Sequence, residues 1–127
     1  KAALAAFLLQ SKHNAQAIND IVHPAVAADF GRSGYDYMEC AILFDSGFID
    51  RVHIDKVVCV TAPLAERVQR IVQRDHITPA KAQEWIDRQM PQDEVLKRSH
   101  YEIVNDGKCD VDAQIQEIIE EISETNK

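Results

Sequence analysis

Hydrophobic residues along the chain follow two patterns, and each pattern predicts one kind of element. In most stretches the apolar positions are three or four residues apart, which is typical of a helix with one buried face. The predicted helices are residues 1–10, 14–22, 24–30, 63–74, 78–89 and 92–98, and a last helix that Asp110 caps. Thr78 before Pro79 is a clear start signal, because a threonine cap and a proline in the first turn both favour a helix N-terminus.

Three short apolar runs lie between these helices and predict buried strands of a parallel sheet. The runs are residues 37–41, 57–61 and 101–104. Glu39 lies inside the first run, and a buried, unpaired carboxylate is costly, so a metal, a cation or a hydrogen-bond donor should meet it. The alternative is a half-exposed strand with Glu39 on its solvent face.

The order of these elements predicts an α/β fold. Residues 57–74 read as a strand, a short turn and an amphipathic helix, which is half of a βαβ unit. The next two helices lie between two predicted strands and contain few core-forming residues. We therefore expect them to form a mobile flap, or lid.

Charge narrows the function classes. The chain of 127 residues is 46% hydrophobic and 28% charged, with a net charge of -7, which argues against general binding to nucleic acid or anionic membranes. Residues 67–98 contain seven basic and five acidic residues, whereas residues 102–127 contain two basic and eight acidic ones. The first of these segments could hold an anionic ligand. No apolar run approaches the ~20 residues that span a bilayer.

The three cysteines, Cys40, Cys59 and Cys109, are far apart and form no C-x-x-C motif. We interpret them as reduced structural thiols of a cytosolic protein, with no zinc site.

His23 precedes Pro24, and proline disfavours the helical conformation at the residue before it. We therefore expect a break between two helices at this point. His23 would then be either a contact at a helix end, which spacing alone favours, or a ligand donor.

Six segments in a fixed order carry a family resemblance. They are His23-Pro24, ECAILFDSG at 39–47, the strand and turn at 57–63, residues 70–75, WIDRQMP at 85–91 and IVNDG at 103–107. In this order and spacing the chain resembles the carboxyl-terminal two thirds of a dephospho-CoA kinase. The resemblance implies a P-loop kinase fold with a partial parallel sheet that lacks its first strands, a helical substrate region and a helical lid. It also implies transfer of the ATP γ-phosphate to the ribose 3′-hydroxyl of dephospho-CoA, the last step of coenzyme A biosynthesis, with Mg²⁺.

The resemblance suggests a division of the chain into four parts. They are a helical substrate-binding region (1–35), the core sheet and helix (36–74), the lid (75–99), and the last core strand with the C-terminal helix (100–127). It implies that His23, Leu43 and Phe44 contact dephospho-CoA. It also places Glu39 beside the phosphate loop on the substrate side, where it would act on Mg²⁺ through bound water.

The resemblance also identifies two lid cations and an adenine-binding turn. Arg74 and Arg88 would stabilise charge on the transferring phosphoryl group, and Arg74 would also contact the nucleotide. The alternative for each arginine is a solvated charge on a helix face. Asn105 and Gly107 would receive adenine, and the alternative there is a plain turn at the end of a strand.

Two features of the family are absent from these residues: the phosphate loop, a G-x-x-x-x-G-K-S/T motif, and the amino-terminal aspartate. In P-loop kinase order the strand with that loop lies between 37–41 and 57–61. We therefore expect the sequence to be part of a longer chain. Alone, the 127 residues should be inactive, bind ATP weakly, and be poorly folded or pair with another chain. Another small-molecule P-loop kinase and a non-enzymatic interaction module remain open as rival functions.

Overall fold

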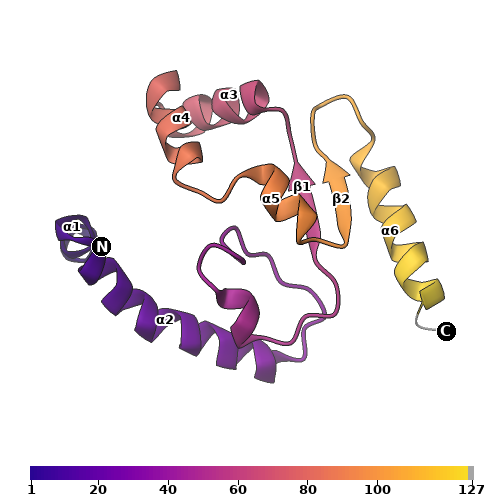
Figure 1. Ribbon diagram of the computed structural model, residues 1–127, viewed down its shortest axis with the longest axis horizontal. Coiled ribbons are helices and arrows are strands. Elements are labelled where there is room, and N and C mark those ends of the chain that lie inside the picture. Colours follow the sequence, from indigo (N-terminus) through magenta and orange to yellow (C-terminus); the bar gives the residue numbers. More distant parts are fainter. Residues whose placement is uncertain (126–127) are drawn as a thin grey trace. The chain divides into compact units, whose positions relative to one another are not determined.

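The computed structural model describes residues 1–125, whose helices and strands lie in two compact units (Figure 1). The first unit is Lys1–Ile54, and the second starts at Asp55. The first contains the helices α1 (Ala2–Gln10) and α2 (Lys12–Ser33) and the 3₁₀ helix η1 (Phe48–Arg51). The second contains β1 (Val58–Thr61), α3 (Leu64–Asp75), α4 (Pro79–Asp87), α5 (Gln92–Lys97), β2 (Tyr101–Val104) and α6 (Val111–Thr125).

The second unit is an α/β arrangement around two parallel strands, as predicted. The strands pair in register from Val58 with Tyr101 to Thr61 with Val104. Helices α3, α4 and α5 form the connection between them, and α4 packs on α3 while α5 packs on β1 (Figure 1). Helix α6 follows β2 and packs against it. Parallel pairing places the carboxyl ends of both strands at the same edge, where ligands bind in open α/β sheets.

Strand β1 is buried on one face only, so the prediction of a buried strand holds for half of its side chains. Cys59 and Thr61 are buried, whereas Val58 and Val60 are 38% and 59% exposed. Side chains alternate between the two faces of a strand, so the face with the valines is the more exposed one.

One backbone edge of β1 also lacks a strand partner among the described residues. The amide of Tyr101 donates to the carbonyl of Val57, and the amide of Asn105 donates to that of Thr61. Since alternate residues of a parallel strand bond to the same neighbour, the backbone groups of Val58 and Val60 face the opposite edge. The two-stranded sheet supplies nothing there.

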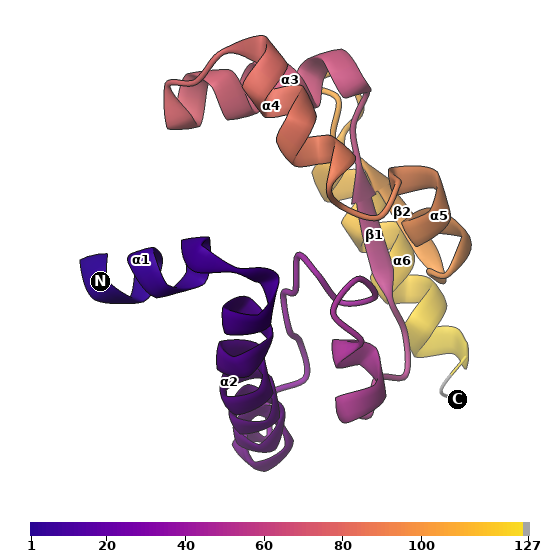
Figure 2. The same ribbon diagram turned by 60° about the vertical axis from the view of Figure 1, so that its left-hand side comes forward.

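The first unit corrects the predicted break at Pro24. Helix α2 runs through Pro24 without interruption and ends at Gly34, whose φ of 73° is left-handed. An interior proline removes one helical hydrogen bond, and the long helical stretches on both sides keep the others. Helix α2 is capped by Ser11, whose Oγ accepts from the Asn14 amide at 3.1 Å, so the helix begins before residue 14, where it was predicted to start. The bend between α1 and α2 is visible in Figure 2.

The predicted strand at 37–41 is wrong as well. These residues are irregular, and the chain turns at 41–46 before η1. Tyr37 is 83% exposed. A strand forms only where a neighbour accepts its backbone hydrogen bonds, and the first unit contains no strand that could do so.

Candidate functional site

In the first unit one candidate residue, His23, contacts the buried side chain of Phe48. This side chain is only 4% exposed. The His23 ring meets it edge-on, with the ring centroids 6.1 Å apart and the planes at 87°. Within this unit His23 therefore packs the middle of α2 against η1, and it is not a helix-end residue.

Leu43 and Phe44 lie in a turn that backbone hydrogen bonds hold in place. The Leu43 carbonyl accepts from the Ile49 amide, and the Phe44 carbonyl accepts from the Gly47 amide, both at 3.1 Å. Gly47 has a φ of 72°, a left-handed conformation that glycine adopts without strain. Both apolar side chains are half-buried. The turn therefore presents two partly exposed apolar groups, and both lie shortly before Phe48 in the sequence.

Glu39 is exposed, so the argument that a buried carboxylate must meet a cation does not apply to it. The cause is the missing strand pairing at 37–41, since an irregular segment leaves the side chain in water. Its proposed action on Mg²⁺ through a water molecule needs no burial and stays a prediction.

In the second unit Asn105 and Gly107 follow the end of β2. The Asn105 amide donates to the Thr61 carbonyl at 2.7 Å, which joins this turn to the end of β1. Gly107 has a φ of 79°. Between them, the Asp106 carboxylate accepts from the backbone amides of Cys109 at 2.8 Å and Lys108 at 2.9 Å. The predicted turn is confirmed, and its contact with adenine stays a prediction.

The same two hydrogen bonds make the turn sensitive to acid. The amides of Cys109 and Lys108 lower the pKa of the Asp106 carboxyl, because they stabilise its charged form. A lowered pKa in the folded state stabilises the fold above the ordinary value of about 3.9, and the contribution is lost as the pH falls through the folded-state value. We expect Asp106→Asn to lower the urea midpoint at about pH 6, and the difference from the wild type to shrink as the pH falls below the ordinary carboxyl pKa of about 3.9. Asp36→Asn, at another exposed carboxylate, is the control; an equal loss at both pH values would contradict the assignment.

Two glutamines that the sequence analysis missed hold the strand ends. Gln92 accepts from the Ala62 amide at 3.0 Å and donates to the Ala62 carbonyl at 3.1 Å. Gln114 accepts from the Val104 amide at 2.8 Å and donates to the Val104 carbonyl at 3.0 Å. Each glutamine supplies both hydrogen bonds that a further strand would otherwise supply to that residue. The sequence could have identified Gln114, because this polar residue interrupts the apolar stripe of Val111, Ile115 and Ile118.

Gln92 also divides the predicted lid in two. It fixes the start of α5 to the end of β1, whereas α4 packs on α3, with Ala82 fully buried. The part of the lid that carries Arg88 is therefore α4, which is joined to the core through α3.

Arg74 lies in the last turn of α3, at the corner between α3 and α4. Its Nε and Nη2 both donate to Oδ2 of Asp75, at 3.0 and 2.7 Å. This hydrogen bond and the charge of Asp75 raise the pKa of the Arg74 guanidinium, which stays charged. The side chain is 71% exposed, so it is accessible to an anionic ligand.

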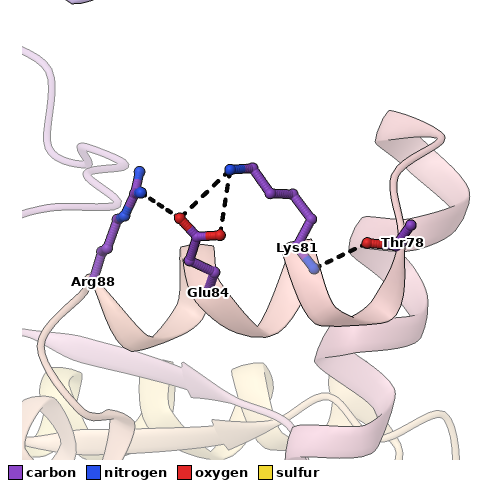
Figure 3. A network of polar contacts seen from close by, with 4 residues as sticks. All are labelled: Thr78, Lys81, Glu84 and Arg88. Carbon is purple, nitrogen blue, oxygen red and sulfur yellow. Dashed lines mark hydrogen bonds and ion pairs between the residues drawn. The ribbon is translucent and has the colours of Figure 1, made fainter.

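Arg88 lies at the other end of α4, beyond a helix about 14 Å long. Its guanidinium pairs with the Glu84 carboxylate, which also meets the Lys81 ammonium at 3.3 Å (Figure 3). Thr78 caps the same helix by accepting from the Lys81 amide at 3.1 Å, as predicted (Figure 3). The structure does not bring the two arginines together, because each is paired with a carboxylate of its own helix.

The remaining candidate groups suggest no further chemistry. Burial raises the pKa of the Cys59 thiol, and nearby Glu102 adds to the effect, so the thiol stays neutral and unreactive. Residues 1–125 contain no group of three His, Cys, Asp or Glu side chains that could hold a metal ion. In the same range no helix is long and apolar enough to cross a membrane.

Comparison with known proteins extends over most of the chain. The dephospho-CoA kinase family model matches residues 1–111. A dephospho-CoA kinase of Bacteroides fragilis (strain YCH46) is 38% identical over 127 residues, covering 94% of this chain and 60% of that protein. A dephospho-CoA kinase of Ruegeria pomeroyi is 32% identical, covering 86% of this chain and 57% of that protein.

The fold has a solved counterpart. The crystal structure of TT1252 from Thermus thermophilus matches with a TM-score of 0.74 and 25% identity, covering 93% of this chain and 64% of that one. The chain therefore spans about 60% of the length of the curated relatives described above.

Proposed function

The chain belongs to the dephospho-CoA kinase family, and we propose that the whole protein transfers the γ-phosphate of ATP to the ribose 3′-hydroxyl of dephospho-CoA. The match of the family model to residues 1–111 carries the proposal. The arrangement of the second unit supports it: a parallel strand pair, a turn at its carboxyl edge, and helices that carry exposed arginines. By the same membership we expect the enzyme in the cytoplasm.

The residues of the second unit would act on the nucleotide and the moving phosphate. Asn105 and Gly107 would hold adenine at the strand ends, where the bond from the Asn105 amide to Thr61 fixes the turn. Arg74 and Arg88 would meet the negative charge that spreads over the phosphoryl oxygens during transfer. For this to happen, each guanidinium must release its carboxylate, or it must donate to the carboxylate and the phosphate together.

The residues of the first unit would act on the acceptor. Leu43 and Phe44 offer half-buried apolar surface to dephospho-CoA, and His23 would supply a polar contact through the part of its ring that Phe48 does not cover.

Magnesium is compatible with the described side chains. Mg²⁺ keeps several waters and is usually bound through one or two carboxylates and the substrate phosphates, so a cage of three protein ligands is not required. Glu39, exposed and acidic, fits a contact through water. When bound, the ion would neutralise phosphate charge.

A coupled ADP-release assay on the complete gene product tests the proposal. Dephospho-CoA, adenosine and shikimate serve as rival acceptors, and we expect dephospho-CoA to give the highest kcat/KM. A preference for either rival acceptor would favour another small-molecule kinase, and no turnover of any acceptor would favour an interaction module. In the same assay, residues 1–127 alone should be inactive.

A further inference from the structure

The two arginines proposed to bind phosphate are both occupied by carboxylates. Arg74 is paired with Asp75, and Arg88 is paired with Glu84. The Glu84 carboxylate pairs with two cations of α4, one a helical turn before it and one a helical turn after it (Figure 3). Its two partners are Lys81 and Arg88.

The position of Glu84 does not suggest a role in stability. Its side chain is 46% exposed, and that of Arg88 is 68% exposed. Exposed ion pairs one helical turn apart contribute little to folding, because water screens them and two long side chains must be ordered. The contact does have a consequence for binding, since it uses Nη2, one of the guanidinium donors that a phosphate would need.

A polyphosphate can displace such a carboxylate. ATP carries several negative charges and offers paired oxygens to a guanidinium, whereas Glu84 offers a single charge in water. If an anion binds only after the ion pair opens, its apparent affinity is lowered by the equilibrium constant that favours the closed pair.

We propose that Glu84 is a positioning residue that holds Arg88 in the nucleotide-free enzyme and releases it to the phosphates of ATP. The inference rests on the proposed kinase function. In the nucleotide-free enzyme Glu84 offsets the positive charge of Arg88. Arg88 then stays on α4 until a ligand with several negative charges competes for it.

Glu84→Gln in the complete protein tests this, with initial rates measured at varied ATP. We expect KM for ATP to fall about two- to fivefold with kcat unchanged, since the substitution removes a competitor of weak strength and one repulsive charge. The matched control is Glu66→Gln on α3, which breaks another Glu–Arg pair with the same spacing, the one with Arg70 at 3.5 Å. The control should leave KM for ATP unchanged.

A double-mutant cycle shows whether the effect acts through Arg88. In an Arg88→Ala background, Glu84→Gln should change KM for ATP no more than the control does. A loss of structure would not lower KM, and a thermal melt of each variant verifies folding. An unchanged or raised KM, or a fall that persists without Arg88, would overturn the role of Glu84 and leave the kinase function standing. If the wild-type protein does not phosphorylate dephospho-CoA, the proposed function fails and this role fails with it.

Discussion

Arg74→Ala in the complete protein should lower kcat about 100-fold or more and change KM for dephospho-CoA far less. The reason is that the guanidinium would meet charge that develops mainly in the transition state, and loss of one such contact costs a factor of this size. The side chain is 71% exposed and its ion-pair partner, Asp75, is its neighbour in sequence, so its removal should not disturb the core. Steady-state kinetics with varied dephospho-CoA at saturating ATP measure both constants.

Arg70→Ala is the matched control for that experiment. Arg70 lies one turn earlier on α3 and pairs with Glu66 on the same helix. Its removal should leave kcat nearly unchanged. If Arg74→Ala also leaves kcat unchanged, Arg74 is a surface charge and the assignment of a catalytic role is wrong.

Phe48→Ala should cost about 3 kcal/mol or more of the free energy of unfolding. Removing a buried phenylalanine loses its transfer free energy and leaves a cavity. Phe48 is the most buried side chain of the first unit, and its contact with the His23 ring is lost as well. Urea denaturation of the complete protein, followed by fluorescence and circular dichroism, measures the change.

Phe7→Ala is the control for burial. Phe7 lies on α1 and is 39% exposed, so the same substitution should cost about 1 kcal/mol or less. Equal losses for the two variants would mean that the burial of Phe48 against His23 does not stabilise the first unit.

Elements that depend on nearby residues were predictable from the sequence. Thr78 and Pro79 start α4, Asp110 caps α6 by accepting from the Ala113 amide at 3.0 Å, and the break after α3 falls at His76. Each of these signals lies within a few residues of the structure that it determines. The parallel strand pair was also predictable, because its β-branched and aromatic runs are separated by amphipathic helices.

Elements that depend on a distant partner were not predictable in the same way. Residues 37–41 have the composition of a strand, but the first unit offers no neighbouring strand to pair with them. The hydrogen bonds of Gln92 to Ala62 join residues thirty positions apart, and no local sequence pattern predicts them. The proline at position 24 gave a false signal, because the rest of α2 tolerates the loss of one hydrogen bond.

The candidate site shows the same division. The spacing of Glu84 and Arg88 predicts an ion pair within a helix, and the resemblance selects Arg74, Arg88, Asn105 and Gly107 as candidates. Neither the spacing nor the resemblance indicates that Arg74 is also paired with a carboxylate, that of Asp75, in the described structure. That arrangement follows from the side-chain contacts of α3 and α4.

Identification of the reaction product shows whether the complete protein phosphorylates the ribose 3′-hydroxyl of dephospho-CoA. The complete protein is incubated with ATP, Mg²⁺ and dephospho-CoA, and the product is purified and examined by mass spectrometry and phosphorus NMR. We expect a new phosphate monoester on the ribose 3′-hydroxyl, with one ADP formed for each phosphate transferred. A phosphate on any other hydroxyl, or recovery of unmodified dephospho-CoA, would contradict the proposed function.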